Sequence, residues 1–171
     1  MIALAIGAFS KARVAAIEYD ERRPPEVPAP EEVPVVPAQP QMPPFSRQWE
    51  LRYAIGKPPF RGDTEGPTVS GGWIEPLDHH PVDAALVAQI TDAWLPAVFV
   101  RLTEPNAVPT IDLTIHFRAE LPLPAGPLLV QFESRLSRGG FVEEDGWIWS
   151  REGDLIAHSR QLALLQAPTH D

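Results

Sequence analysis

The sequence predicts an α+β fold in which one antiparallel β-sheet wraps around a single central helix. The second half of the chain contains only one long helical pattern, at residues 81–95. Segments with strand-like patterns lie on both sides of it, two before and four after. Gly139-Gly140 and the turn at residues 152–154 separate the later segments at hairpin distances. A sheet wrapped around one helix is the simplest arrangement that buries both apolar faces.

Two strands are predicted before the helix. Residues 48–55 alternate, with Trp49, Leu51 and Tyr53 on one face. Residues 68–77 form the second strand, in which the pair Gly71-Gly72 weakens the preference for extended structure.

The helix is predicted over residues 81–95. Pro81 suits the first helical position, Asp83 lies in the first turn, and Pro96 bounds the other end. Apolar residues recur on one face, which we expect to be buried: Val82, Leu86, Ile90 and Trp94.

Four strands are predicted after the helix. Residues 111–117 alternate, with apolar side chains facing inward at Ile111, Leu113, Ile115 and Phe117. The other three are predicted at residues 128–136, 141–150 and 155–165.

Three polar residues stand out from these patterns. Asp92 lies near the helix end, where it is either an exposed carboxylate or part of a site. Gln161 lies on the same strand face as Ala157 and Ala163. If that face turns inward, the buried amide needs hydrogen-bond partners, which are either groups of a site or the neighbouring backbone. Thr110 belongs by alternation to the outward face, and it reaches a site only if the strand begins with a bend or bulge.

The N-terminal quarter of the chain reads differently. Residues 1–19 are largely apolar and form either a strand or a short helix, which must dock on something. Residues 24–44 carry nine prolines and are predicted to be an extended, proline-rich linker. A ligand for an SH3-type domain is the alternative, but basic specificity residues are lacking. The compact domain is expected to span residues 45–171.

Composition excludes several classes of function. A net charge of -9 argues against nucleic-acid or anionic-membrane surfaces. The absence of cysteine excludes disulfides and thiol nucleophiles. No segment has the length of a membrane span, so we expect a soluble, cytoplasmic protein. His79-His80 beside Asp78 is interpreted as a helix start rather than a metal site, and His116 and His158 as surface residues.

The order and spacing of four segments resemble the C-terminal repeat of the acyl-CoA thioesterase II family, within the thioesterase-like superfamily. The segments are GGWIEP (71–76), TDAWLP (91–96), TIDLTIHF (110–117) and DGWIWSREGDLIAHSRQ (145–161). The resemblance implies a hot-dog fold, in which full members carry two repeats. It also implies that Asp92, Thr110 and Gln161 hold the hydrolytic water, and that no cofactor or metal is needed.

The implied chemistry is hydrolysis of acyl-CoA to a fatty acid and CoA. A carboxylate, Asp92, deprotonates the water, while Thr110 and Gln161 position it. We expect the Gly71-Gly72-Trp73 segment to contact the substrate, with backbone N–H groups near it or the helix stabilising the oxyanion.

The chain departs from the family by carrying one repeat. Residues 1–23 resemble the last strand of a preceding repeat, so a C-terminal fragment is expected. A single repeat exposes an apolar edge, and we expect it to form a homo-oligomer through that edge or to be unstable. Several arginines could meet CoA phosphates, although solvated surface positions explain them as well: Arg118, Arg135, Arg138, Arg151 and Arg160.

Two other functions stay open. One is a non-catalytic hot-dog module that binds an acyl or CoA group or serves as a dimer partner. The other is a hot-dog hydratase, whose Asp-His pair is imitated only loosely by Asp78-His79-His80.

Overall fold

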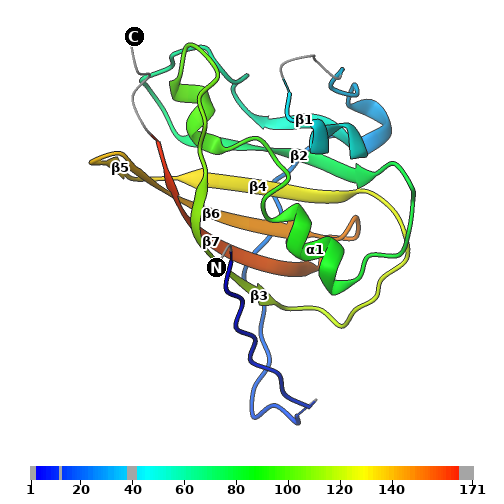
Figure 1. The fold of residues 1–171 in the computed structure, drawn as a ribbon. Helices are drawn as coiled ribbons and strands as arrows, with labels where there is room; N and C mark the ends of the chain where they lie inside the picture. The colour runs from blue at the N-terminus through cyan, green and yellow to red at the C-terminus, as the bar shows by residue number, and fades with distance from the viewer. Residues whose placement is uncertain (1–2, 12, 38–41, 166–171) are drawn as a thin grey trace.

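The computed structural model describes residues 3–11, 13–37 and 42–165. These residues form a seven-stranded antiparallel sheet and one α-helix, which confirms the predicted fold class. Figure 1 shows the helix lying across one face of the sheet.

The six predicted strands all occur, with bounds that differ by a few residues. The structure adds a two-residue strand, β5, which pairs with β6. The strands are β1 (Trp49–Gly56), β2 (Thr68–Pro76), β3 (Thr110–Phe117), β4 (Leu128–Ser134), β5 (Ser137–Arg138), β6 (Phe141–Trp149) and β7 (Leu155–Leu164). Their order in the sheet is β1-β2-β4-β6-β7-β3, so β3 pairs with β7 at the far edge (Figure 1).

The helix α1 (Ala84–Ile90) is shorter than predicted. Asp83 is the N-cap, and its side chain accepts a hydrogen bond from Leu86 N, so Pro81 is not the first helical residue. At the other end, Thr91 Oγ1 donates to Ala88 O at 2.7 Å, which competes with continued helix. Residues 91–94 therefore form a turn, and Asp92 lies in it.

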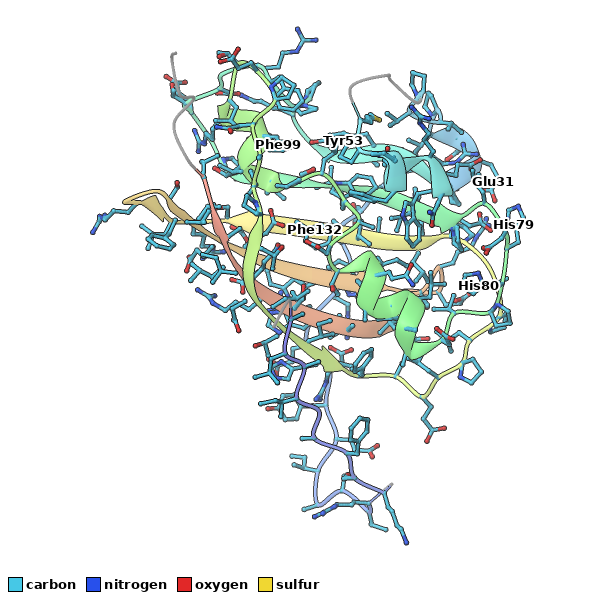
Figure 2. All side chains as sticks on the ribbon, in the orientation of Figure 1. Glu31, Tyr53, His79, His80, Phe99 and Phe132 are labelled. Carbon is cyan, nitrogen blue, oxygen red and sulfur yellow. The ribbon has the colours of Figure 1, made fainter. Side chains whose placement is uncertain are left out.

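The core lies between α1 and the inner face of the sheet. Leu86, Val87 and Ile90 of α1 pack in one cluster with inward side chains of β2, β4, β6 and β7, including Ile74 and Ile148. Trp94 is buried as its helical spacing predicted, although it lies beyond the helix. Its ring stacks on that of Tyr53, at 5.9 Å between centroids. Tyr53 lies in the edge strand β1 and is labelled in Figure 2.

The proline-rich segment packs against the outer face of the sheet rather than running free. Val33 is 6% exposed and belongs to a cluster with Trp73, Trp147 and Trp149. Hydrogen bonds hold it at both ends: Trp73 Nε1 donates to Pro28 O at 3.0 Å, and Val36 N donates to Leu51 O at 2.7 Å. A short 3-10 turn, Pro30–Glu32, lies between them. The described part of this segment forms no strand of the sheet and no α-helix, but it docks on the domain because Val27 and Val33 cover apolar side chains of the outer face.

Residues 3–23 have neither the strand nor the helix that the sequence left open, among the residues described. In Figure 1 the blue segment runs from beside β3 away from the sheet and then returns to it, and apolar side chains such as Ile6 and Phe9 are 90% and 95% exposed. At the end of this segment the Arg22 guanidinium lies over the Trp147 ring, 4.7 Å from its centroid, whereas the large apolar side chains described in residues 3–19 stay exposed.

Candidate active site

Three predicted site residues meet where the turn after α1 approaches the edge of the sheet. Asp92 comes from that turn, Thr110 is the first residue of β3, and Gln161 lies in β7. Gln161 Nε2 donates to Asp92 Oδ1 at 2.8 Å, and Thr110 Oγ1 donates to the same oxygen at 3.2 Å. Gln161 Nε2 also contacts Thr110 Oγ1. The carboxylate, the hydroxyl and the amide therefore form one hydrogen-bonded group.

Thr110 reaches this group because β3 starts with an irregularity. Thr110 pairs with Ala163 and Asp112 pairs with Leu162, so Ile111 is an extra residue in the ladder. An extra residue reverses the alternation of the strand at that point. Thr110 thereby leaves the outward face that it would share with Asp112 in a regular strand.

Gln161 faces the core side of the sheet, on the parity that it shares with Ala157 and Ala163. Its exposure is 9%, so its amide needs partners, and both come from side chains of the site. The alternative, a bond from this amide to neighbouring backbone, is not what the structure shows.

A cavity of about 320 Å³ opens beside these residues. Its size lies at the lower end of small-molecule pockets. Asp92, Thr110 and Gln161 supply polar groups to its wall. Apolar side chains supply most of the rest, among them Leu51, Trp94, Leu95, Val98, Phe99, Val108 and Val142.

Glu144 is a further carboxyl of this cavity that sequence reasoning missed. It lies opposite Gln161 in the ladder of β6 and β7, and its Oε2 accepts a hydrogen bond from Ala97 N at 2.6 Å. Burial, helped by the negative charges of Asp92 and Asp145, raises the pKa of Glu144 to about 7. The sequence does contain a signal for this residue, because strand alternation places Glu144 on the same inward face as Val142 and Gly146.

The structure does not bring the predicted substrate-binding residues to this cavity. Gly71 and Gly72 lie within β2, which is paired on both sides. A Cβ at Gly72 would come within 2.0 Å of Arg52 O, and one at Gly71 within 2.2 Å of Val130 O. The close approach of neighbouring strands therefore explains both glycines. Trp73 faces the opposite side of the sheet, where its indole contacts the proline-rich segment.

The four histidines that the structure describes also lie outside the cavity wall. His79 and His80 are exposed and lie in the loop between β2 and α1 (Figure 2). His79 Nδ1 is 2.9 Å from Glu75 Oε1, and His80 Nδ1 is 2.6 Å from Asp78 Oδ1. Within the described ranges, no group of three or more acidic, His or Cys side chains could hold a metal ion.

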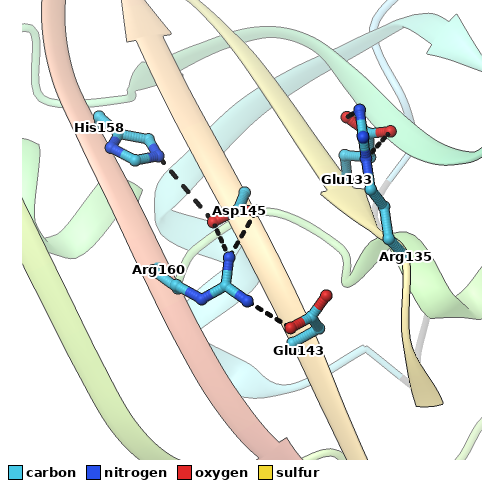
Figure 3. A network of polar contacts seen from close by, with 6 residues as sticks. All are labelled: Glu133, Arg135, Glu143, Asp145, His158 and Arg160. Carbon is cyan, nitrogen blue, oxygen red and sulfur yellow. Dashed lines mark hydrogen bonds and ion pairs between the residues drawn. The ribbon is translucent and has the colours of Figure 1, made fainter.

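Three of the five arginines considered for CoA phosphates bind carboxylates instead. Arg160 bridges Asp145 and Glu143, and Arg135 binds Glu133, as Figure 3 shows. Arg151 makes two hydrogen bonds to Glu31, at 2.6 and 3.0 Å.

Comparisons with known proteins agree with this architecture. A profile of the family described as acyl-CoA thioesterase C-terminal domain matches residues 23–165. That match includes the segment packed on the outer face. A comparison with curated protein sequences gave no match. In the part of the chain that the structure describes, no helix has the length and apolar character needed to cross a membrane.

Solved structures share the fold. A conserved protein of unknown function with a hot-dog fold from Alicyclobacillus acidocaldarius is 27% identical, with a TM-score of 0.79 over 92% of this chain and 60% of that chain. A candidate thioesterase from Novosphingobium aromaticivorans is 23% identical, with a TM-score of 0.72 over 91% of this chain and 59% of the other. An acyl-CoA thioesterase II from Mycobacterium marinum is 16% identical, with a TM-score of 0.64 over 91% and 60%. This chain thus spans about three fifths of the length of these relatives.

Proposed function

The chain belongs to the acyl-CoA thioesterase C-terminal domain family, and from this premise we propose that it hydrolyses acyl-CoA thioesters to a carboxylic acid and CoA. The observation that carries the proposal is the convergence of Thr110 Oγ1 and Gln161 Nε2 on Asp92 Oδ1 at the wall of an apolar cavity. A carboxylate held in this way suits general-base activation of water, and the apolar wall suits an acyl chain.

In the proposed reaction, Asp92 takes a proton from a water molecule as the oxygen of that water bonds to the thioester carbon. Oδ1 accepts bonds from Thr110 and Gln161, which leaves Oδ2 to receive the proton. The C–S bond then breaks, and the proton on Asp92 passes to the departing thiolate. Water is the nucleophile, so the step requires no covalent intermediate.

The test is release of free CoA from a series of acyl-CoAs of different chain length. We expect Asp92→Asn to reduce kcat/KM by about 10²- to 10⁴-fold, because it removes the base and keeps the shape of the side chain. Asp112→Asn, two residues into β3 and outside the cavity wall, is the matched control and should leave the rate unchanged. Undiminished hydrolysis by Asp92→Asn would exclude the mechanism.

The alternative is a non-catalytic module that binds an acyl or CoA group. It is favoured by one observation, that the chain spans only about three fifths of its relatives' length. Saturable binding of acyl-CoA without turnover by the unchanged chain would support this alternative.

A further inference from the structure

The second carboxyl of the cavity, Glu144, has no part in the proposed hydrolysis. It lies on the inner face of β6, opposite the Gln161 that binds Asp92. Its Oε2 is fixed by the backbone N–H of Ala97, at the start of a 3-10 helix, Ala97–Arg101, that continues the cavity wall. Glu144 is therefore held in place on the same wall as the reacting group.

The electrostatic surroundings of Glu144 are acidic. The charged groups that act on it are Asp92, from the turn after α1, and Asp145, the next residue on its own strand. From β7 it meets the neutral amide of Gln161, and from the 3-10 helix only the Ala97 N–H. The nearby Arg160 is bound to Asp145 and Glu143. Among the described residues of the cavity wall there is no lysine, arginine or histidine.

We propose that Glu144 is a positioning residue that acts through Asp92: when ionised, its charge drives negative charge off Asp92 and towards the substrate. This inference rests on the proposed function. During attack, a proton moves from water to Asp92, and the negative charge leaves Asp92 for the thioester oxygen. The proposal requires Glu144 to lie nearer to Asp92 than to that oxygen, since a like charge so placed favours this movement.

The coupling has a definite pH range. With its pKa near 7, the carboxyl of Glu144 is neutral in acid and ionised in base. The accelerating charge is therefore absent well below pH 7 and present well above it. Coupling between two titrating groups is reciprocal, so the charge of Asp92 must also hold up the pKa of Glu144.

The first arm of the test measures the Glu144 pKa directly, by NMR of its side-chain carboxyl carbon in a pH titration. We expect this pKa to fall in Asp92→Asn and to stay in place in the control Asp112→Asn. An unchanged Glu144 pKa in Asp92→Asn would overturn the proposal. This arm needs no enzymatic activity, so it separates failure of the coupling from failure of the proposed function.

The second arm compares pH–rate profiles for kcat. We expect the wild-type kcat to rise several-fold as the pH passes 7, and Glu144→Gln to lack this rise while matching the wild type at low pH. Glu133→Gln, a carboxyl paired with Arg135 outside the cavity, should behave as wild type. A glutamine still accepts the bond from Ala97, so a purely structural role predicts superposable profiles for Glu144→Gln and wild type, and that result would overturn the proposal. Glu144→Ala, which removes the acceptor, shows separately how much stability the anchor contributes in urea unfolding.

Discussion

At the scale of single residues, the candidate site depends on one extra residue in β3. In a regular strand Thr110 would face outward with Asp112. The extra residue, Ile111, reverses the alternation, so that Thr110 faces inward. The hydroxyl then shares Asp92 Oδ1 with the amide of Gln161. Two neutral donors on one carboxylate oxygen fix its direction without neutralising its charge, which is what a base that must accept a proton requires.

Gln161→Ala tests this positioning. It retains the Asp92 side chain but removes the donor at 2.8 Å that orients it, so we expect kcat/KM to fall by about 10²-fold through misplacement of the carboxylate. The matched control is Gln89→Ala, an exposed amide on α1, with no expected effect. Steady-state release of CoA measures both. Equal rates for Gln161→Ala and wild type would show that Asp92 needs no such support.

At the scale of elements, the proline-rich segment is part of the domain. It covers an outer-face cluster of Trp73, Trp147 and Trp149 that would otherwise meet water. Prolines keep it extended and reduce the entropy lost when it docks. Glu31 and Arg151 add an ion pair at the surface, which contributes little by comparison.

A comparison of Val33 with Val35 tests whether the proline-rich segment is docked on the sheet or only extended. Val33 is 6% exposed and Val35 is 45% exposed. We expect Val33→Asp to lower the free energy of unfolding by about 2 to 4 kcal/mol, because it buries a carboxylate in an aromatic cluster. Val35→Asp should change the free energy by no more than about 0.5 kcal/mol. Urea unfolding followed by tryptophan fluorescence measures both, and equal effects would contradict a docked segment.

At the scale of the whole molecule, two apolar surfaces lack partners within the described chain. β3 ends the sheet, and its Ile111 and Phe117 are 50% and 44% exposed. The segment of residues 3–19 exposes a second set of large apolar side chains. An unpaired, apolar edge strand is a site for association. The structural relatives extend well beyond the length matched here.

We therefore expect the chain to self-associate at micromolar concentration through the β3 edge. Sedimentation velocity of the wild type should show a dimer or larger species. Ile111→Lys and Phe117→Lys should shift it towards monomer, because a charge on the edge strand opposes pairing. His116→Lys, between them in sequence and on the opposite face of β3, is the control for added charge. A well-folded wild-type monomer at these concentrations would contradict the expectation.

The strands and the buried side of the helical segment were predictable because their signals are local. Trp49, Leu51 and Tyr53 alternate within β1, and Val82, Leu86, Ile90 and Trp94 are all buried. The helix ends were wrong, since Asp83 and Thr91 bond to nearby backbone in ways that periodicity does not reveal. Trp73 was assigned to the substrate, but the parity of a strand does not say which face of the sheet carries the site.

The sequence by itself determined the positions of six strands and of one helical segment, and it singled out Asp92, Thr110 and Gln161 as candidate site residues. Local backbone preference and hydrophobic spacing carry that information. Only the tertiary structure placed β3 beside β7, shifted the register at Ile111, packed the proline-rich segment on the outer face and brought Glu144 to the cavity. Each of these features depends on contacts between residues far apart in the chain. Such contacts contribute to stability only once the sheet has formed around the helix.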